Sequence, residues 1–283
     1  MPVNLRQIKS RIKVIDNTRK VTSALEMISV TKLNRTEKQL TGFKPYFLKL
    51  DEIFCRLTGC NKNLASPYLN GNNSPEICLV VIASDSGLCG VYNSNIIRFA
   101  EEFISSRGRD AVSLVIVGRR ALNYFQKKGY RILESYAGLN GRYSAASCDE
   151  ITAKVSDLFL KGDTGSVFVA YTHFKTALAH KPALVKFLKL EPPDMKEVDY
   201  IAEPGMEAIL DSLIPGYLAK KMRLMIMESF AAEHSARTVA MKKATDNAEE
   251  LSAKLELLRN KVRQAAITQD IMEIISSAEA LKG

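Results

Sequence analysis

The stretch KATDNAEELSAKLELLRNKVRQAAITQDIMEII, residues 243–275, contains neither glycine nor proline. It lies inside a run of 66 residues, Tyr217 to Lys282, that lacks both. At about 1.5 Å per residue, the whole run would form a helix of ~99 Å. A globular domain of a chain this long cannot contain such a helix. We therefore expect a C-terminal helical arm that reaches beyond a compact body.

Two patterns run along this arm. In its first part, alanine recurs at every fourth position from 232 to 248. This ridge would let another helix approach closely, although alanine is also common in helices simply because it is the best helix former. In the second part, apolar residues are spaced alternately by four and three positions, which predicts the heptad seam of a coiled coil. These residues are Leu251, Leu255, Leu258, Val262 and Ala265.

A shorter arm at the N-terminus is suited to pair with the first. Residues 3–41 also lack glycine and proline and would form a helix of about 58 Å. The segment from Thr41 to Pro45 is expected to bend or interrupt that helix. Because the arms flank a compact middle, we expect them to return to each other as an antiparallel pair. The apolar residues at helical spacing are Ile8, Ile12, Ile15, Val14, Val21, Leu25, Ile28, Phe47, Leu50, Phe54 and Leu57.

The middle of the chain alternates between β-branched runs and amphipathic helical patterns. The runs EICLVVIASD (76–85) and VSLVIVG (112–118) are typical of buried parallel strands. The segment between them predicts a helix capped by Asn93 or Ser94 and stopped by Gly108. The fold class expected is therefore α/β, with a Rossmann-like, mostly parallel sheet domain between the two long helices. Further elements are expected as a helix at 147–162 and strands at 166–174 and 183–190.

Charge divides the chain in the same way as these patterns. We expect an N-terminal helix at 1–57, a globular domain at 58–216, and a C-terminal helix at 217–283 that starts after Pro215 and Gly216. The first segment holds 12 Lys and Arg against 5 Asp and Glu, the second 17 against 17, and the third 11 against 9. Basic arms of this kind usually meet an anionic partner. We favour an acidic protein surface over nucleic acid, since no stacking aromatic residues lie in the most basic part and no DNA-reading module is evident.

The turn SDSGLCGVYNSN, residues 84–95, follows the first strand and precedes a helix, where Rossmann-like folds place a phosphate loop. It supplies Gly87 and Gly90 but neither glycine fingerprint of a nucleotide site. A structural turn and a loop that contacts another protein are the other interpretations, and we favour the contact loop.

Other chemistry is sparsely represented. The five cysteines and three histidines are scattered without metal-ligand spacing, so we expect free thiols, no metal, no cofactor and no catalytic residues. No apolar run reaches the roughly 18 residues of a membrane span. The start MPVNLRQIKSRIK also lacks the apolar core of a signal peptide. We therefore expect the protein on the cytosolic side.

Four stretches of this chain resemble the γ subunit family of the F-type ATP synthase. They are EHSARTVAMKKATDNAEEL (233–251), NKVRQAAITQDIMEIISSAEAL (260–281), SDSGLCG (84–90) and RIKVIDNTRKVTSALEMISVTKL (11–33). The resemblance implies a non-catalytic rotor subunit whose coiled coil enters a hexamer of α and β subunits. Its α/β domain would rest on the c-ring beside the ε subunit, at the cytoplasmic face of a bacterial inner membrane.

The same resemblance implies contact residues. Arg263 and Gln264 match a pair that reaches a β-subunit loop, and the segment from Ile267 onward, with Thr268 and Gln269, matches a tip that turns in an apolar sleeve. Residues expected to meet acidic levers of the β subunits are Arg19, Lys20, Lys32, Arg35 and the turn around Cys89.

A further residue, Glu203, matches an acidic position near the ring or the ε subunit. The chain departs from the family at Ser86, where arginine is usual, at Leu25, where methionine is common, and at Ala202, where an aromatic residue is usual. The competing hypotheses are a stand-alone α/β nucleotide-binding enzyme with helical dimerisation arms, and a coiled-coil adaptor on nucleic acid or membrane.

Overall fold

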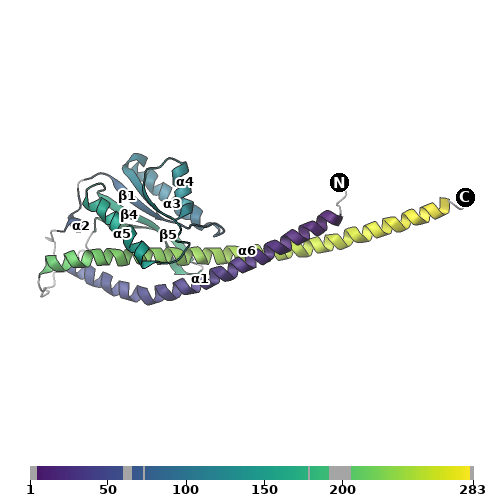
Figure 1. Cartoon of the computed structure of the whole chain (residues 1–283), viewed down its shortest axis with the longest axis horizontal. Coiled ribbons are helices and arrows are strands. Elements are labelled where there is room, and N and C mark those ends of the chain that lie inside the picture. Colours follow the sequence, from purple (N-terminus) through teal and green to yellow (C-terminus); the bar gives the residue numbers. More distant parts are fainter. Residues whose placement is uncertain (1–4, 60–65, 73, 178, 191–204, 281–283) are drawn as a thin grey trace. The chain divides into compact units, whose positions relative to one another are not determined.

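The computed structural model describes residues 5–59, 66–72, 74–177, 179–190 and 205–280, and these residues form two compact units. We call Met1–Ile28 with Thr238–Gly283 the helical unit, and Ser29–Arg237 the sheet unit. Two long helices, α1 (Leu5–Gly59) and α6 (Met206–Ala280), contribute to both (Figure 1). No helix in the described part of the chain is both long and apolar enough to cross a membrane.

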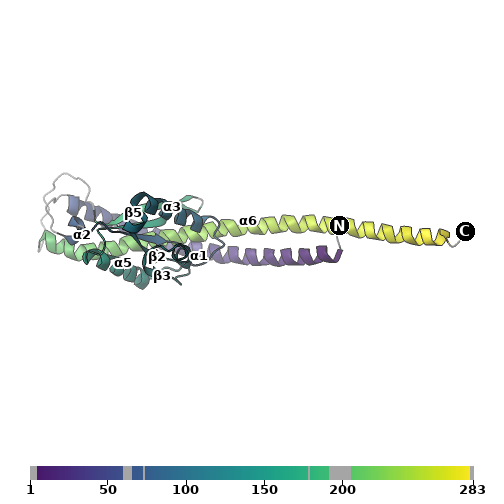
Figure 2. The same ribbon diagram turned by 90° about the horizontal axis from the view of Figure 1, so that it is seen from above.

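In the helical unit, α1 and α6 run antiparallel, as the sequence predicts (Figure 2). The Ser252 hydroxyl donates to the Asp16 carboxylate at 3.0 Å. Further along α1, Thr22 lies against Thr245, whose hydroxyl donates to that of Thr22 at 2.8 Å. As the residue number increases along α1, that of its partner on α6 decreases, which confirms the antiparallel pairing.

The predicted seam of α6 is confirmed at Leu255 and Val262 but is wrong at the other three positions. Leu251 and Leu258 are 47% and 38% exposed, and Ala265 is exposed as well. The apolar pattern misplaces the seam because Thr245 and Ser252 hydrogen-bond across the interface, so that polar side chains occupy seam positions at little cost. The seam positions, which are buried or half-buried and alternate by four and three, are Met241, Thr245, Ala248, Ser252, Leu255, Arg259 and Val262.

The corresponding seam of α1 also includes polar residues. Ile8, Ile12 and Thr22 are buried, whereas Val14 and Val21 of the predicted stripe are 61% and 59% exposed. Ile28 is exposed too. The alanines on the predicted ridge of α6 are all buried or half-buried.

Two predicted helix boundaries are also wrong. Of the bend or interruption predicted at 41–45, the interruption is wrong, since α1 continues through Pro45. α6 begins before Pro215 and Gly216 rather than after them. A proline inside a helix removes one backbone donor and strains the preceding turn. Near Pro215 this cost is offset by burial of neighbouring side chains, with Ile214 and Leu218 both 0% exposed.

The sheet unit is an α/β fold, which confirms the predicted fold class. Among its described residues, five strands have the order β3-β2-β1-β4-β5, and β5 alone is antiparallel, paired with β4. The sequence patterns predict neither α4 nor β3, because both elements are short and β3 is only half-buried. The strands are β1 (Ile77–Ile82), β2 (Val112–Val117), β3 (Ile132–Tyr136), β4 (Ser166–Thr176) and β5 (Ala179–Leu188). The shorter helices are α2 (Pro67–Asn70), α3 (Tyr92–Arg107), the 3-10 helix η1 (Arg109–Ala111), α4 (Arg119–Lys127) and α5 (Ala145–Leu160).

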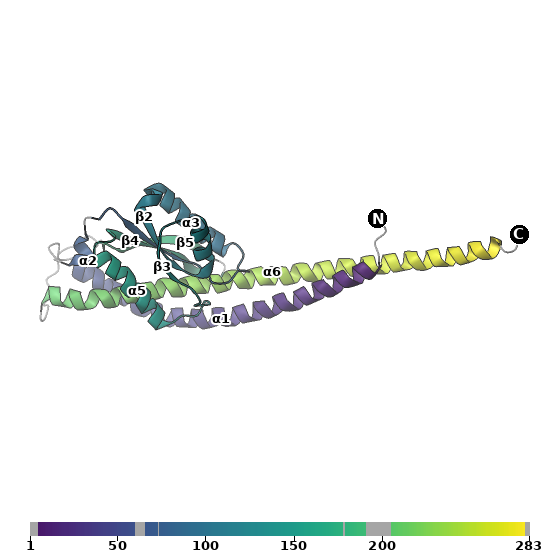
Figure 3. The same cartoon turned by 45° about the horizontal axis from the view of Figure 1, so that its top comes forward.

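Both faces of the sheet are covered, so its central strands are apolar throughout. Along β1, Val80 and Ile82 belong to a core shared with α1, α5 and α6, whereas Leu79 and Val81 belong to a core shared with α3 and α4. This alternation follows from the two-residue period of a strand. The result is a three-layer unit in which the sheet separates α3 and α4 from α5 (Figure 3).

Candidate functional site

The turn between β1 and α3, residues 84–90, is held by its own side chains. Asn93 donates its amide hydrogens to the Ser84 hydroxyl at 2.8 Å and to the Cys89 sulfur at 3.1 Å. The predicted cap of α3, Asn93 or Ser94, is wrong, because Val91 is the N-cap and no side chain caps the helix there. The stop at Gly108 is confirmed, since it is the C-cap with φ +91°.

A buried arginine of α6 holds the same turn from the other side. The Arg237 guanidinium donates to the Ser86 hydroxyl at 2.9 Å, to the Gly87 carbonyl at 3.3 Å and to the Glu233 carboxylate at 2.7 Å. The Ser86 hydroxyl oxygen can accept a hydrogen bond from Arg237. An arginine at position 86 would have only donors and could not accept this bond. The contact ties the end of β1 to α6 inside the sheet unit.

Glu233 and His234 lie beside Arg237 and are both almost completely buried. Burial raises the pKa of Glu233, which the adjacent Arg237 guanidinium opposes. Burial also lowers the pKa of His234, to about 4. The imidazole is therefore neutral near pH 7, and its Nε2–H donates to the Gly141 carbonyl at 2.9 Å.

Asp85 fixes a neighbouring loop rather than serving as an exposed charge. Its carboxylate accepts three backbone N–H groups, from Arg119 at 3.0 Å, Gly138 at 2.9 Å and Asn140 at 2.7 Å. Thus the residues of the 84–90 turn bind a helix start, a loop and α6. Such an arrangement positions backbone but supplies no nucleophile with an adjacent base.

The place where a nucleotide-binding fold would receive phosphate is occupied by side chains of the chain itself. A Cβ at Gly87 would lie 2.5 Å from the Arg120 guanidinium. Arg237 covers the carbonyl of the same glycine. This geometry does not support the nucleotide-binding interpretation of the turn. Among the described residues, no group of three or more His, Cys, Asp or Glu side chains is placed to hold a metal ion.

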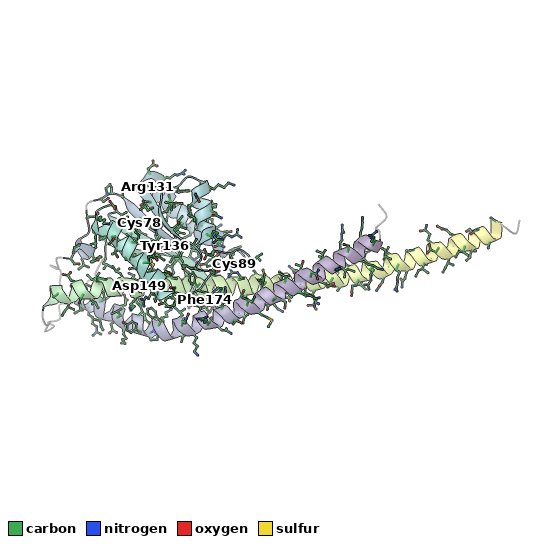
Figure 4. All side chains as sticks on the ribbon, in the orientation of Figure 1. Cys78, Cys89, Arg131, Tyr136, Asp149 and Phe174 are labelled. Atoms are coloured by element: carbon green, nitrogen blue, oxygen red, sulfur yellow. The ribbon has the colours of Figure 1, made fainter. Side chains whose placement is uncertain are left out.

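Cys89, which is labelled in Figure 4, is one of the predicted contact residues, and its exposed fraction is only 2%. The apolar side chains beside it point outward instead: Leu88 is 64% exposed and Val91 is 67% exposed. Leu88 also has a φ of +62°, a strained conformation for a leucine that often marks functional turns. The surface of this turn is therefore formed by the neighbours of Cys89.

The predicted basic residues divide between the two units. In the helical unit, Arg19 is half-buried and lies 4.0 Å from Glu249, while Lys20 is exposed. In the sheet unit, Lys32 and Arg35 line one groove, and the Lys32 ammonium donates to the Asn140 carbonyl at 3.2 Å. The structure thus brings Lys32 and Arg35 together.

The predicted tip residues all lie on the last part of α6, which extends beyond the N-terminal end of α1 within the helical unit (Figure 2). Arg263, Gln264, Ile267, Thr268 and Gln269 are all exposed. The Thr268 hydroxyl donates to the Gln264 carbonyl at 3.0 Å, and the Gln269 amide donates to the Glu273 carboxylate at 3.0 Å, so both bonds stay within the helix.

An apolar stripe follows this tip at helical spacing. Ile267 and Ile271 are each 51% exposed, Ile274 is 68% exposed and Ile275 is 48% exposed. Burying such side chains is worth roughly 1.5–3 kcal/mol each. A stripe of this kind marks a surface that another protein covers. Glu203, the remaining predicted contact, lies outside the described residues.

Comparison with known proteins gives matches along nearly the whole chain. The family profile ATP-synt, described as ATP synthase, matches residues 4–281. The ATP synthase gamma chain of Pelotomaculum thermopropionicum is 34% identical over 99% of this chain and 99% of its own. That of Heliobacterium modesticaldum is 36% identical over 98% and 99%.

Solved structures share the fold at lower identity. A chain of the Euglena gracilis mitochondrial ATP synthase, in a structure of OSCP, F1 and the c-ring, aligns with a TM-score of 0.69 and 16% identity, covering 98% of this chain and 94% of its own. A chain of the Tetrahymena thermophila central stalk and c-ring structure aligns with a TM-score of 0.62 and 20% identity, covering 79% and 99%.

Proposed function

The chain belongs to the family of ATP synthase gamma chains, and on that premise we propose that it is the central-stalk rotor subunit of an F-type ATP synthase. The observation that carries the proposal is the tip of α6. Its isoleucines are about half exposed or more on a helix that no other described segment of the chain covers. Covering this helix requires other subunits, and the α/β hexamer provides a central cavity for it.

In this role the subunit transmits rotation rather than performing chemistry. Proton flow turns the c-ring, and the shaft forces each β subunit in turn through conformations of different nucleotide affinity. The shaft needs differential contacts with the three β subunits but no catalytic residue, metal or cofactor of its own. We place the subunit peripherally at the cytoplasmic face of a bacterial inner membrane.

The contact residues receive different tasks. Arg263 and Gln264 can form charge-assisted and amide hydrogen bonds with a β-subunit loop that break at each step. Ile267, Thr268 and Gln269 lie in the sleeve around the tip, where weakly directional contacts permit slip. The proposed contacts with acidic levers of the β subunits are Arg19, Lys20, Lys32, Arg35 and the turn around Cys89.

The remaining contacts are assigned to the globular part. We propose that residues 58–216 rest on the c-ring beside the ε subunit, with Glu203 in that contact. Residues 1–57 and 217–283 form the shaft. At the turn, exposed Leu88 and Val91 would touch the β subunit directly, while buried Cys89 supports them.

Co-expression with α and β subunits tests the proposal. The full chain should co-purify with the hexamer and support ATP-driven rotation, whereas a chain ending at residue 262 should lose torque. A Leu88→Cys chain cross-linked to a β subunit should block turnover until the disulfide is reduced. The proposal fails if α and β subunits do not co-purify with the chain, or if the truncated chain couples normally. Turnover of a nucleotide by the isolated chain would instead favour the stand-alone enzyme.

A further inference from the structure

A groove of the sheet unit lies between α1 and the loop of residues 138–143, with a volume of about 250 Å³. Lys32, Arg35 and Gln39 line it from α1, and Arg142 and Tyr143 line it from the loop. Pockets for drug-sized ligands have volumes of roughly 300–1,000 Å³. The groove therefore suits a smaller ligand.

The lining of the groove is strongly positive. It contains three cations, Lys32, Arg35 and Arg142, and no carboxylate. Lys32 donates to the Asn140 carbonyl, and none of the three forms an ion pair with another described residue. Two acids lie behind the groove. Glu233 is within electrostatic reach of Lys32 but is bound to Arg237, and the Asp85 carboxylate is bonded to backbone N–H groups of the loop, including that of Asn140. The groove thus holds positive charge that the described part of the sheet unit does not neutralise at its surface.

The loop side of the groove is held in a fixed position. Asp85 accepts the backbone N–H groups of Gly138 and Asn140, and His234 donates to the Gly141 carbonyl. Gly141 has a φ of +64°, and a Cβ there would lie 2.5 Å from the His234 ring. Because a buried network fixes this backbone, Arg142 faces Lys32 and Arg35 without the loop having to fold on binding, which reduces the entropic cost of binding.

We propose that this groove binds a small oxyanion of the phosphate class, either inorganic phosphate or the terminal phosphates of a nucleotide. Two guanidinium groups can each bind phosphate oxygens in a bidentate manner, and an ammonium adds a point charge. The Gln39 amide supplies a neutral donor. A compact di- or trivalent anion matches three converging cations better than a single carboxylate, which carries one charge. The proposal goes beyond the rotor function, which needs no small ligand.

Isothermal titration calorimetry on the full chain tests this proposal at constant ionic strength, with sodium phosphate, ADP and ATP titrated separately. Arg142→Gln and Arg35→Gln should each weaken binding about tenfold, since each removes charge-assisted hydrogen bonds. Lys38→Gln is the matched control, because Lys38 is an exposed cation on the same helix outside the groove. The Lys38→Gln chain should bind phosphate, ADP and ATP with the affinity of the unaltered chain. Equal affinity for phosphate and ADP identifies free phosphate as the ligand, and tighter binding of ADP or ATP identifies the nucleotide.

Two results would overturn the proposal. One is phosphate and nucleotide affinity that Arg35→Gln and Arg142→Gln leave unchanged. The other is binding of poly-glutamate without binding of phosphate or nucleotide, which would leave Lys32 and Arg35 only their proposed contact with acidic levers of the β subunits. Arg142 also separates this proposal from the rotor function, in which it has no assigned contact. Arg142→Gln should lose the anion and keep co-purification with α and β subunits. Thermal melting of each variant confirms that it is folded.

Discussion

The Arg237 guanidinium and the Ser86 hydroxyl form a hydrogen bond of 2.9 Å across 151 positions of the chain. The same guanidinium binds the buried Glu233 carboxylate. One side chain therefore neutralises a charge inside the sheet unit and holds the turn that follows β1. Loss of this side chain should be felt both in stability and in the shape of the turn.

Replacing Arg237 with alanine should lower the free energy of unfolding by about 3–5 kcal/mol, because it leaves the buried Glu233 carboxylate without its partner. Urea denaturation of the full chain measures this change. Lys154→Ala is the control, since Lys154 and Glu134 form an exposed pair at 3.6 Å, and such pairs contribute about 0–1 kcal/mol. If the loss comes from the unpaired charge, Glu233→Leu combined with Arg237→Met should recover part of it. An equal loss in the double variant would contradict this explanation.

The neutral, buried His234 should make the protein less stable in acid. Its pKa is about 4 when folded, against an ordinary value of 6.5. Between these values the unfolded chain binds more protons, so stability rises with pH and this contribution is lost as pH falls from 6.5 to 4. The full effect would be about 3 kcal/mol, on the scale of 1.36 kcal/mol per pKa unit.

The contribution of His234 is measured by comparing the free energy of unfolding at pH 4.5 and pH 7 in the unaltered chain and in His234→Gln. Glutamine retains a donor for the Gly141 carbonyl but cannot titrate, so the variant should show a smaller difference between the two pH values. His180→Gln serves as a comparison, because burial lowers the pKa of His180 in the same direction, but His180 is only half-buried on the edge strand β5 and its substitution should reduce the difference less. The same difference in all three chains would rule out His234 as the source.

At the tip, Ile271→Asp should separate function from folding. Ile271 is exposed, so its substitution should change stability by less than about 0.5 kcal/mol. A charge placed in an apolar sleeve would nevertheless disturb rotation, and we expect reduced torque in single-molecule rotation of the assembled complex. Asp270→Asn, at the neighbouring exposed position, should rotate normally. Normal torque from Ile271→Asp would show that this stripe is not the buried face.

In the seam of the helical unit, Thr245→Val should cost about 1 kcal/mol, because it removes the donor to the Thr22 hydroxyl. Thr22→Val should cost a similar amount. The double variant should lose less than the sum, since two apolar groups of the same shape leave no polar atom unsatisfied. A thermodynamic cycle of the four chains measures the coupling. Strict additivity would mean that the two hydroxyls do not interact.

The sequence predicts those features that depend on local periodicity and composition. The absence of glycine and proline over 66 residues predicts α6, and β-branched runs predict β1 and β2, because a buried strand needs apolar side chains on both faces. It fails where a partner distant in sequence decides the outcome. Leu251 has the spacing of a seam residue but is exposed. Ser252 is half-buried instead, because the Asp16 carboxylate accepts a hydrogen bond from its hydroxyl.

The candidate site shows the same limit. Similarity to a family identifies Lys32 and Arg35, but no spacing indicates that Arg142 faces them. That relationship depends on Asp85 and His234, which fix the intervening loop through backbone atoms. Hydrogen bonds to backbone groups leave no pattern of side chains in the sequence. The roles of Arg237 and Ser86 are hidden for a similar reason, since their contact requires the folded sheet unit.

The register between Thr22–Thr245 and Asp16–Ser252 also limits how this chain can change in length. Inserting one residue into α6 between Thr245 and Ser252 would rotate every later side chain by about 100° around the helix axis. Ser252 would leave the interface, and the isoleucines of the tip would face another direction. In a surface loop such an insertion changes the structure only locally, whereas in α6 the rotation would affect every side chain up to the last residue of the helix. Deletions and insertions in this stretch should therefore be accepted only in combinations that restore the angular phase of the helix.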